Sequence, residues 1–157
     1  MICYACGNKM RKKVGDYHYV ESGLPNVTLL GITIFHCACG EEMPVIPCPD
    51  KLQTKLAQAI AAKPKPLSGA EIRFLRKFLV LKANEFAELL GVSKVTVSRW
   101  ENGKVKIDKS YDALVRAVAT NQDFRAFLAK RSKSRAKGGP GKTNYILDAR
   151  ELAACSA

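Results

Sequence analysis

Apolar residues recur at helical spacing from residue 68 to residue 129. The segment opens on Ser68-x-x-Glu71, which has the spacing of a capping box and predicts a first helix to about Leu79. The same periodicity predicts four further helices, over residues 83–90, 93–102, 110–119 and 122–129. Gly91 and Asn102-Gly103 supply turns on either side of the third helix. This part of the chain is therefore expected to be all α, with five helices.

Residues 1–48 have a different pattern, rich in cysteine, glycine and β-forming residues. Short strands are predicted at Asp16–Val20, Val27–Leu30 and Ile32–Phe35, with a turn at residues 22–25 and Gly31 between the last two strands. A helix over residues 50–62 follows them. Three strands of this length bury little apolar surface, so the sheet needs another source of stability.

Lys63-Pro64-Lys65-Pro66 is expected to be a stiff extended connector, because proline lacks an N–H and charge flanks both prolines. The predicted fold class is α+β. It comprises a cysteine-rich β domain with a trailing helix over residues 1–62, a linker over 63–67, a helical domain over 68–129 and a basic tail over 130–157. Residues 130–142 carry six positive charges and no acid, which favours disorder, and Tyr145–Ala154 is compatible with a short helix.

Charge is distributed unequally along the 157 residues, whose net charge is +12. Residues 1–62 carry six Lys/Arg against five Asp/Glu, whereas residues 63–157 carry twenty against nine. A basic region behind a near-neutral one suggests a polyanionic partner, and solubility alone is the alternative. No stretch approaches the roughly 20 apolar residues of a membrane span, and the start has no signal-peptide pattern. A cytoplasmic protein is expected, in which the six cysteines are not explained by disulfides.

Residues 83–102 combine an eight-residue helix, a glycine turn and a second helix. This geometry places the second helix in the major groove of DNA. When Val97 and Trp100 are assigned inward, the outward positions of that helix are Lys94, Val95, Thr96, Ser98 and Arg99. Arg99 can bond two acceptors on a guanine edge, and Lys94 can reach guanine or phosphate. Thr96 and Ser98 suit phosphate oxygens or a thymine methyl.

The segment EFAELLGVSKVTVSRWENGK resembles the Xre/Cro-type repressor helix-turn-helix family, in both identity and spacing of Ala87, Gly91, Val97, Trp100 and Gly103. The resemblance implies that Lys94, Val95 and Arg99 face bases. It also implies that Lys82, Asn102 and Lys104 lie near phosphates. Lys82 departs from the usual capping residue, and Val95 replaces a polar one, so it either touches a thymine methyl or contributes nothing. A helical bundle with an incidental motif is the alternative.

The cysteines form two clusters, Cys3-x-x-Cys6-Gly and His36-Cys37-Ala38-Cys39-Gly40. Two ligand sets are possible: the four thiolates of Cys3, Cys6, Cys37 and Cys39, which we favour, or a set with His36 in place of Cys37. Soft thiolates in tetrahedral geometry favour Zn²⁺, and four protein ligands leave no open position, so the metal is expected to be structural. Metal binding can supply the stability that the small sheet needs. Cys48 is expected to be a core residue and Cys155 a free thiol.

A cysteine-turn zinc domain followed by an Xre-type domain resembles the MqsA (YgiT-type) antitoxins of bacterial toxin–antitoxin pairs. The resemblance rests on CYACG, HCACGEE and SRWENGK and covers roughly residues 1–129. It implies a zinc domain that contributes to toxin binding and a helical domain that dimerises and represses the shared operon. The chain departs from the family in its second cysteine pair, where two intervening residues are usual.

The expected function is therefore that of a DNA-binding repressor, an antitoxin that acts as a homodimer on double-stranded operator DNA and binds a toxin through its N-terminal domain. A stand-alone regulator without a toxin and a zinc-stapled protein-interaction adaptor are the alternatives. An enzyme is not expected, because the chain has no Gly-rich phosphate loop, no recognisable carboxylate pair and no open metal site.

Overall fold

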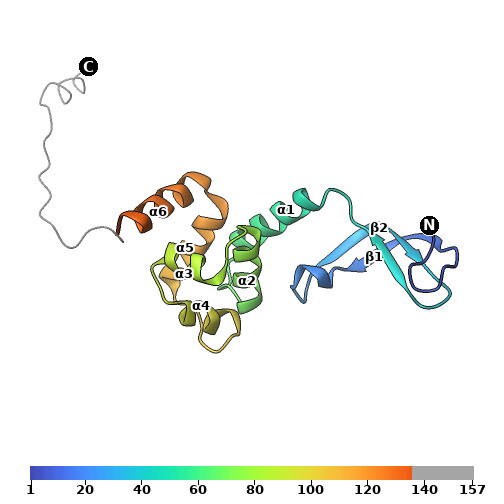
Figure 1. The fold of residues 1–157 in the computed structure, drawn as a ribbon, viewed down its shortest axis with the longest axis horizontal. Helices are drawn as coiled ribbons and strands as arrows, with labels where there is room; N and C mark the ends of the chain where they lie inside the picture. Colours follow the sequence, from blue (N-terminus) through green and yellow to red (C-terminus); the bar gives the residue numbers. More distant parts are fainter. Residues whose placement is uncertain (136–157) are drawn as a thin grey trace, which may run out of the picture.

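The computed structural model describes residues 1–135, so the predictions for Tyr145–Ala154 and Cys155 lie outside the described residues. A three-stranded sheet precedes the helices (Figure 1). The elements are β1 (Arg11–His18), the short 3-10 helix η1 (Val20–Ser22), β2 (Thr28–His36), β3 (Glu42–Val45), α1 (Pro49–Ala62), α2 (Gly69–Phe78), α3 (Ala83–Leu90), α4 (Lys94–Glu101), α5 (Lys109–Thr120) and α6 (Gln122–Arg135). The sheet forms an arm at one end of the molecule, and helices α2–α6 form a body at the other (Figure 1). The α+β class and the five helices predicted after residue 67 are confirmed.

The central strand β2 pairs antiparallel with β1 on one side and β3 on the other. Apart from Val27, it contains both segments that were expected to be separate strands, and Gly31 lies inside it at φ +64°. The N–H of Gly31 donates to the Asp16 carboxylate at 3.1 Å, beside the register shift between Gly15 and Tyr17. The prediction of two strands was wrong because a left-handed glycine produces a bulge here and does not end the strand.

The edge strands also differ from the prediction. β1 begins at Arg11 and ends at His18, earlier than the expected Asp16–Val20. Its exposed basic start is typical of an edge strand and shows no apolar alternation that a sequence pattern could detect. β3 was not predicted, since a four-residue segment containing Pro44 is a poor strand by composition. It forms because the cysteine turn at residues 37–41 returns the chain beside β2.

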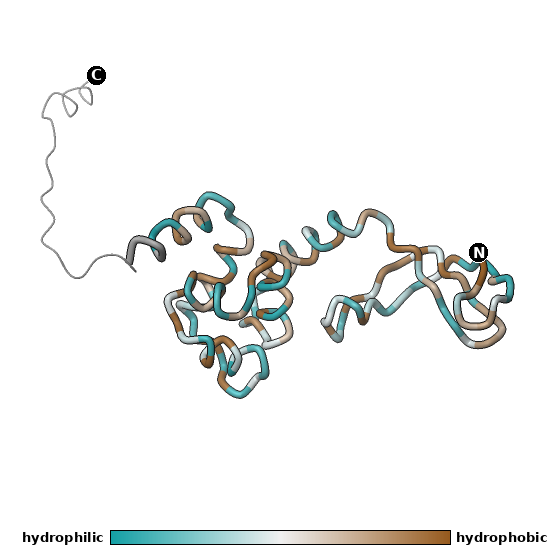
Figure 2. The backbone as a smooth tube through the Cα atoms, viewed as in Figure 1, coloured by the Kyte–Doolittle hydropathy of each residue, from teal (hydrophilic) through white to brown (hydrophobic). Residues whose placement is uncertain are grey.

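Helices α2–α6 enclose the main hydrophobic core. Ser68 and Glu71 form the predicted capping box, with the N–H of Glu71 donating to Ser68 Oγ at 3.3 Å and the N–H of Ser68 donating to the Glu71 carboxylate at 2.7 Å. The most deeply buried side chains of this core are Ile72, Leu75, Phe86, Val97, Val115 and Val118. Figure 2 shows hydrophobic and hydrophilic residues interleaved along the helices, as expected of amphipathic elements. None of the helices within residues 1–135 is long and apolar enough to span a membrane.

Helix α6 continues to Arg135, so the disorder predicted for residues 130–142 was wrong for its first six residues. Lysine and arginine have good helix propensity, and extending an existing helix avoids the cost of nucleation.

Helix α1 packs on the helical body. Ala57 and Ile60 are buried in the same core as Val115 of α5, and Leu24 from the hairpin tip joins them. The side-chain amide of Gln53 also donates to Tyr19 Oη at 3.2 Å, which joins α1 to the arm. The helix that was assigned to the N-terminal domain is therefore part of the packing of the helical body.

The connector after α1 is fixed by a single guanidinium from α5. Arg116 donates to the carbonyls of Ile60, Ala61, Lys63 and Lys65, at distances between 2.6 and 3.3 Å. Its partner Asp112, 2.6 Å away, accepts the N–H of Leu67 at 2.7 Å. The division of the chain at residues 63–67 stays a prediction, with the added finding that α1 packs on the helical side of that division.

Candidate nucleic-acid interface and metal centre

The candidate recognition helix is α4, and local contacts determine which face of it is exposed. Ser93 caps the helix by accepting the N–H of Thr96 at 3.0 Å. Val97 and Trp100 are 0% and 4% exposed, as the sequence pattern predicts, and the ring of Trp100 lies against Tyr111 with centroids 5.2 Å apart. These two inward anchors turn the opposite face of the helix to solvent.

Four of the predicted contact residues lie on that solvent face. Lys94, Val95, Ser98 and Arg99 are all exposed, and Val95, at 58%, is a large apolar side chain open to water. Thr96 is half-buried, and its hydroxyl lies 2.8 Å from Ser93 Oγ. Within residues 1–135 no hydrogen bond or ion pair engages the side chains of Lys94 or Arg99. A cationic side chain without an internal partner remains available to an external anion or base edge.

The flanking candidates differ in their availability. Lys82 and Lys104 are exposed, whereas Asn102 has its side-chain amide engaged at both ends. Asn102 Nδ2 donates to the carbonyl of Ser98 at 2.8 Å, and Asn102 Oδ1 accepts from Arg73 at 2.8 Å. Lys82 precedes α3, and its side chain does not cap the helix. The Glu85 carboxylate compensates by accepting the backbone N–H of Lys82 at 2.7 Å.

A partly buried ion cluster, which sequence reasoning missed, fixes the C-terminal end of α4. Glu101 is 7% exposed as a side chain and accepts from Arg76 at 2.6 and 3.1 Å and from Arg73 at 3.3 Å. The hydrogen bonds that Arg76 donates to Glu101 raise the pKa of Arg76, so this guanidinium stays charged. The sequence signal that could have revealed this cluster is the pair Arg73 and Arg76, one turn apart on α2, together with Glu101 at the end of α4.

Gly69, at the start of α2, lies directly against the same end of α4. A Cβ placed at Gly69 would lie 2.6 Å from the carbonyl oxygens of both Trp100 and Glu101. Only glycine lets these two backbones approach so closely. The orientation of the recognition helix is therefore set by backbone contact as well as by the ion cluster.

The structure brings Cys3, Cys6, Cys37 and Cys39 together at the far end of the arm. Their four Sγ atoms all lie within 4.8 Å of one another, with Cys3–Cys39 at 3.7 Å and Cys6–Cys37 at 3.4 Å. A tetrahedral ion with metal–sulfur bonds of about 2.3 Å requires sulfur atoms about 3.8 Å apart. The cluster therefore has the dimensions of a four-thiolate zinc site.

Two glycine turns of unequal size form this cluster. The N–H of Gly7 donates to the carbonyl of Cys3 at 3.0 Å, and the N–H of Gly40 donates to the carbonyl of Cys37 at 3.1 Å. Both glycines have positive φ, of +72° and +96°. The second turn is one residue tighter, which allows a cysteine pair with one intervening residue to match a pair with two.

His36 does not belong to the cluster that the structure assembles. Its Nδ1 lies 3.0 Å from the Glu42 carboxylate across the β2–β3 pair. Its Nε2 is buried and has no hydrogen-bond partner among the described residues. The geometry therefore favours Cys37 over His36 as the fourth ligand.

The thiols of the cluster differ in acidity. A hydrogen bond from the backbone of Asn8, followed by one from Cys37, lowers the pKa of Cys6 to about 7. The backbone of Cys39 lowers the pKa of Cys37, but the Cys6 sulfur and burial raise it more, to about 12. Thiols this close cannot all ionise unaided, because each thiolate disfavours the next. A bound divalent cation would remove that obstacle.

Cys48 lies outside this cluster, and the expectation that it is a core residue was wrong. It is exposed, precedes α1 and has φ +46°, a left-handed conformation between two prolines. Cys48 is exposed because it lies in the turn that leads into α1 and not on a face that packs against the core.

Comparison with known proteins covers both parts of the molecule. Residues 1–124 match the family described as the antitoxin component of bacterial toxin-antitoxin system, MqsA. Over 64 residues the chain is 38% identical to the uncharacterized HTH-type transcriptional regulator YiaG of Escherichia coli strain K12, an alignment that spans 41% of this chain and 67% of that protein. The same regulator from two further strains of that species matches equally. No solved structure matches.

The family match includes the four-cysteine cluster at one end of the molecule and the exposed face of α4 at the other. The chain therefore belongs to the MqsA antitoxin family.

Proposed function

We propose that this protein is the antitoxin of a toxin–antitoxin pair and represses its own operon by binding operator DNA through α4. The observation that carries the proposal is the two-sided character of this helix: Val97 and Trp100 are buried, while Lys94 and Arg99 are exposed and have no side-chain partner among the described residues. A helix anchored on one side and cationic on the other suits the major groove, where base edges present acceptors beside phosphates.

Each outward side chain has a chemical role in this proposal. Arg99 donates two hydrogen bonds to a guanine edge, and Lys94 contacts guanine or phosphate. Ser98 and Thr96 donate to phosphate oxygens, and Val95 contacts a thymine methyl. Lys82 and Lys104 neutralise phosphates on either side of the helix, which makes binding sensitive to salt.

The proposed DNA-binding form is a homodimer that reads an inverted repeat in the cytoplasm. Two recognition helices on a two-fold axis contact half-sites about 34 Å apart, one turn of DNA. Footprinting of the selected site tests this arrangement. A single unsymmetrical protected region contradicts dimeric binding.

The test of sequence recognition begins with selection of bound DNA from a random pool by the full-length protein. Arg99→Ala should then weaken binding to the selected site by about 1–3 kcal/mol and relax the preference at one base position. Arg131→Ala is the control, since Arg131 is exposed on α6, across the body from α4 (Figure 1), and its loss should leave discrimination unchanged. An equal loss for Arg99→Ala on selected and random DNA would assign Arg99 to phosphate contact only.

The cysteine cluster is proposed to hold one structural Zn²⁺ through Cys3, Cys6, Cys37 and Cys39. The bound ion would join the two glycine turns and supply stability to a sheet of only three short strands. Because all four positions of the ion are taken by sulfur, no site remains for a reacting water, and the proposed role of the ion is structural.

The toxin is proposed to bind the N-terminal arm. Co-expression with the adjacent reading frame tests this pairing, because an antitoxin should co-purify with its product and relieve its toxicity. The match to YiaG, which covers 41% of this chain and names a regulator only, favours a stand-alone regulator as the second candidate. DNA binding without a toxic neighbouring frame would support that candidate, and failure to retard promoter DNA at low salt would favour the interaction adaptor.

A further inference from the structure

Arg73 lies at the junction between α2 and the exposed end of the recognition helix. It belongs to the helix before the helix-turn-helix motif, yet its guanidinium reaches the last residues of α4. Arg73 Nη2 donates to Asn102 Oδ1 at 2.8 Å, and Arg73 Nε lies 3.3 Å from the Glu101 carboxylate. The close approach of Gly69 to α4, one turn earlier, makes this reach possible.

The cluster around Glu101 carries one positive charge in excess, because two guanidiniums share one carboxylate. Each nitrogen of the Arg76 guanidinium donates a hydrogen bond: Nε and Nη2 bond Glu101, and Nη1 donates to the carbonyl of Leu81 at 3.0 Å. Its side chain is 14% exposed, whereas that of Arg73 is 43% exposed. Within residues 1–135 no hydrogen bond engages Nη1 of Arg73. The excess charge therefore lies at the surface, on Arg73.

Two further cations lie at the same turn. The N–H of Lys104 donates to the carbonyl of Arg99 at 2.9 Å, so the chain folds back and keeps these two exposed residues close. Asn102 lies between them in sequence and is held by Arg73. Three cationic residues thus lie at or beside the Asn102–Gly103 turn, and the carboxylate that contacts Arg73 is buried.

We propose that Arg73 contacts a DNA backbone phosphate beside the C-terminal end of α4. Nε and Nη2 of Arg73 stay on Glu101 and Asn102, and the free Nη1 donates to a phosphate oxygen. A planar guanidinium can do both at once, because its donors point along different edges of one plane. Asn102 then acts as a positioning residue that orients Arg73. This inference rests on the proposed binding of DNA by α4.

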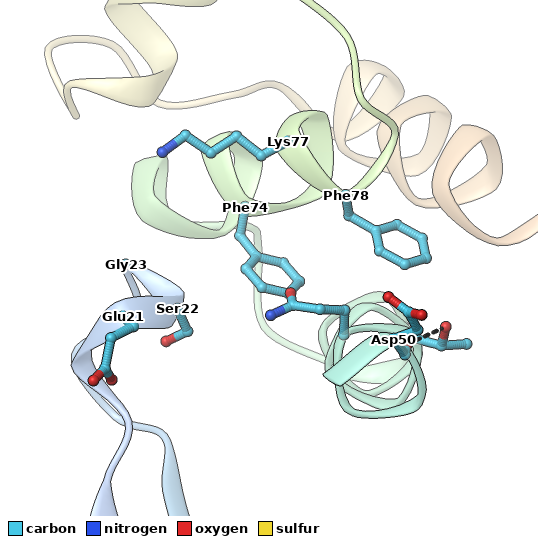
Figure 3. Close-up of a pocket in the computed structure, with 9 residues that line it drawn as sticks. Glu21, Ser22, Gly23, Asp50, Phe74, Lys77 and Phe78 are labelled. Carbon is cyan, nitrogen blue, oxygen red and sulfur yellow. Dashed lines mark hydrogen bonds between the residues drawn. The ribbon is translucent and has the colours of Figure 1, made fainter. Parts of the chain in front are cut away.

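The test compares Arg73→Gln and Arg73→Lys with Lys77→Gln in the full-length protein. Lys77 is the matched control, since it is exposed on the same helix but lines the cavity of about 470 Å³ between α1, α2 and the hairpin tip (Figure 3). Dissociation constants are measured for the selected DNA and for random DNA of equal length, between 50 and 200 mM salt. Thermal unfolding is recorded for each variant, and affinities are measured well below its melting temperature.

Each phosphate contact contributes about 0.9 to the slope of log affinity against log salt concentration. Arg73→Gln should therefore reduce the magnitude of this slope by about 0.9 and lower the affinity for both DNAs by the same factor. Arg73→Lys should keep the slope, because the positive charge remains. It should lose affinity, because an ammonium cannot hold Glu101 and a phosphate together. Lys77→Gln should match the wild type.

Two results overturn the inference in distinguishable ways. An unchanged slope in Arg73→Gln, beside a normal slope in the wild type, means that Arg73 only holds α4 in place, and the proposed function stands. No retardation of either DNA by the wild-type protein removes the proposed function and this contact together.

Discussion

Arg76 Nε lies 2.6 Å from Glu101 Oε1, and this ion pair joins the last turn of α2 to the last residue of α4. The side chains of Arg76 and Glu101 are 14% and 7% exposed, so water screens the ion pair weakly. The helix that we propose reads DNA is therefore oriented by an interaction outside the helix-turn-helix motif.

Removing the charge of Glu101 should destabilise the helical body. Glu101→Gln leaves the largely buried guanidinium of Arg76 without a counter-ion, and the expected loss is about 3 kcal/mol in the free energy of unfolding. Urea denaturation measures it. Glu88→Gln, on the exposed face of α3, is the control and should change stability by less than about 0.5 kcal/mol. A similar small loss for both variants would show that the pair does not support the fold.

Adding one methyl group at Gly69 should push α2 and α4 apart. The new Cβ would lie 2.6 Å from two backbone oxygens that cannot move independently, so Gly69→Ala is expected to cost about 1–3 kcal/mol. DNA affinity should fall with it if the orientation of α4 matters. Gly15→Ala is the matched control, because a Cβ there meets nothing within 4 Å and the backbone is not left-handed. Equal stability of the two variants would contradict the close approach.

Cobalt substitution should distinguish the two ligand sets of the metal centre. Cobalt(II) bound by thiolates has charge-transfer absorption whose intensity follows the number of sulfur ligands. His36→Gln and Cys48→Ser should keep the wild-type spectrum, because neither residue belongs to the cluster. Cys37→Ser should lower the intensity and weaken metal affinity. A weakened spectrum in His36→Gln with an unaffected Cys37→Ser would reverse the assignment.

Asp112 should make stability depend on acidity below pH 4. Burial raises its pKa, but the hydrogen bonds from Arg116 and the N–H of Leu67 lower it by a larger amount. The pKa of Asp112 therefore lies below its ordinary value. The ionised carboxylate therefore stabilises the fold above its unfolded-state pKa of about 3.9, and this contribution is lost as the pH falls through the lower folded-state pKa.

Asp112→Asn tests this dependence, because the amide cannot ionise. The variant should be about 2 kcal/mol less stable at pH 7, and the gap should close as the pH falls below about 4. Denaturant unfolding of both proteins between pH 3 and pH 7 measures the gap. A constant difference across that range would mean that the carboxylate's charge is not what holds the connector.

The helices were predictable because their stability comes from one repeated face. Val97 and Trp100 follow the helical period, and the capping bonds of Ser68 and Ser93 join residues three positions apart. The cysteine cluster was predictable for a similar reason, since each half is a local turn marked by glycine. Where local sequence determines local structure, pattern analysis succeeds.

The remaining features depend on contacts between distant residues. β3 exists through pairing with β2, and Gly31 forms a bulge because Asp16 accepts its N–H across the sheet. Glu101 meets Arg76 only once α2 and α4 are packed, so no spacing rule reveals the pair. The choice between His36 and Cys37 likewise needed the direction of each side chain at the end of β2.

Arg116 donates hydrogen bonds to four backbone carbonyls between residues 60 and 65, at the end of α1 and in the connector, and these bonds have a mechanical consequence. A proline-rich segment that would otherwise act as a spacer is bound along its length to α5, so bending there requires breaking several charge-assisted hydrogen bonds. A displacement imposed on the cysteine end of the arm is therefore transmitted to the body through the contact of Leu24 with the core, the hydrogen bond between Gln53 and Tyr19, and the chain between β3 and α1.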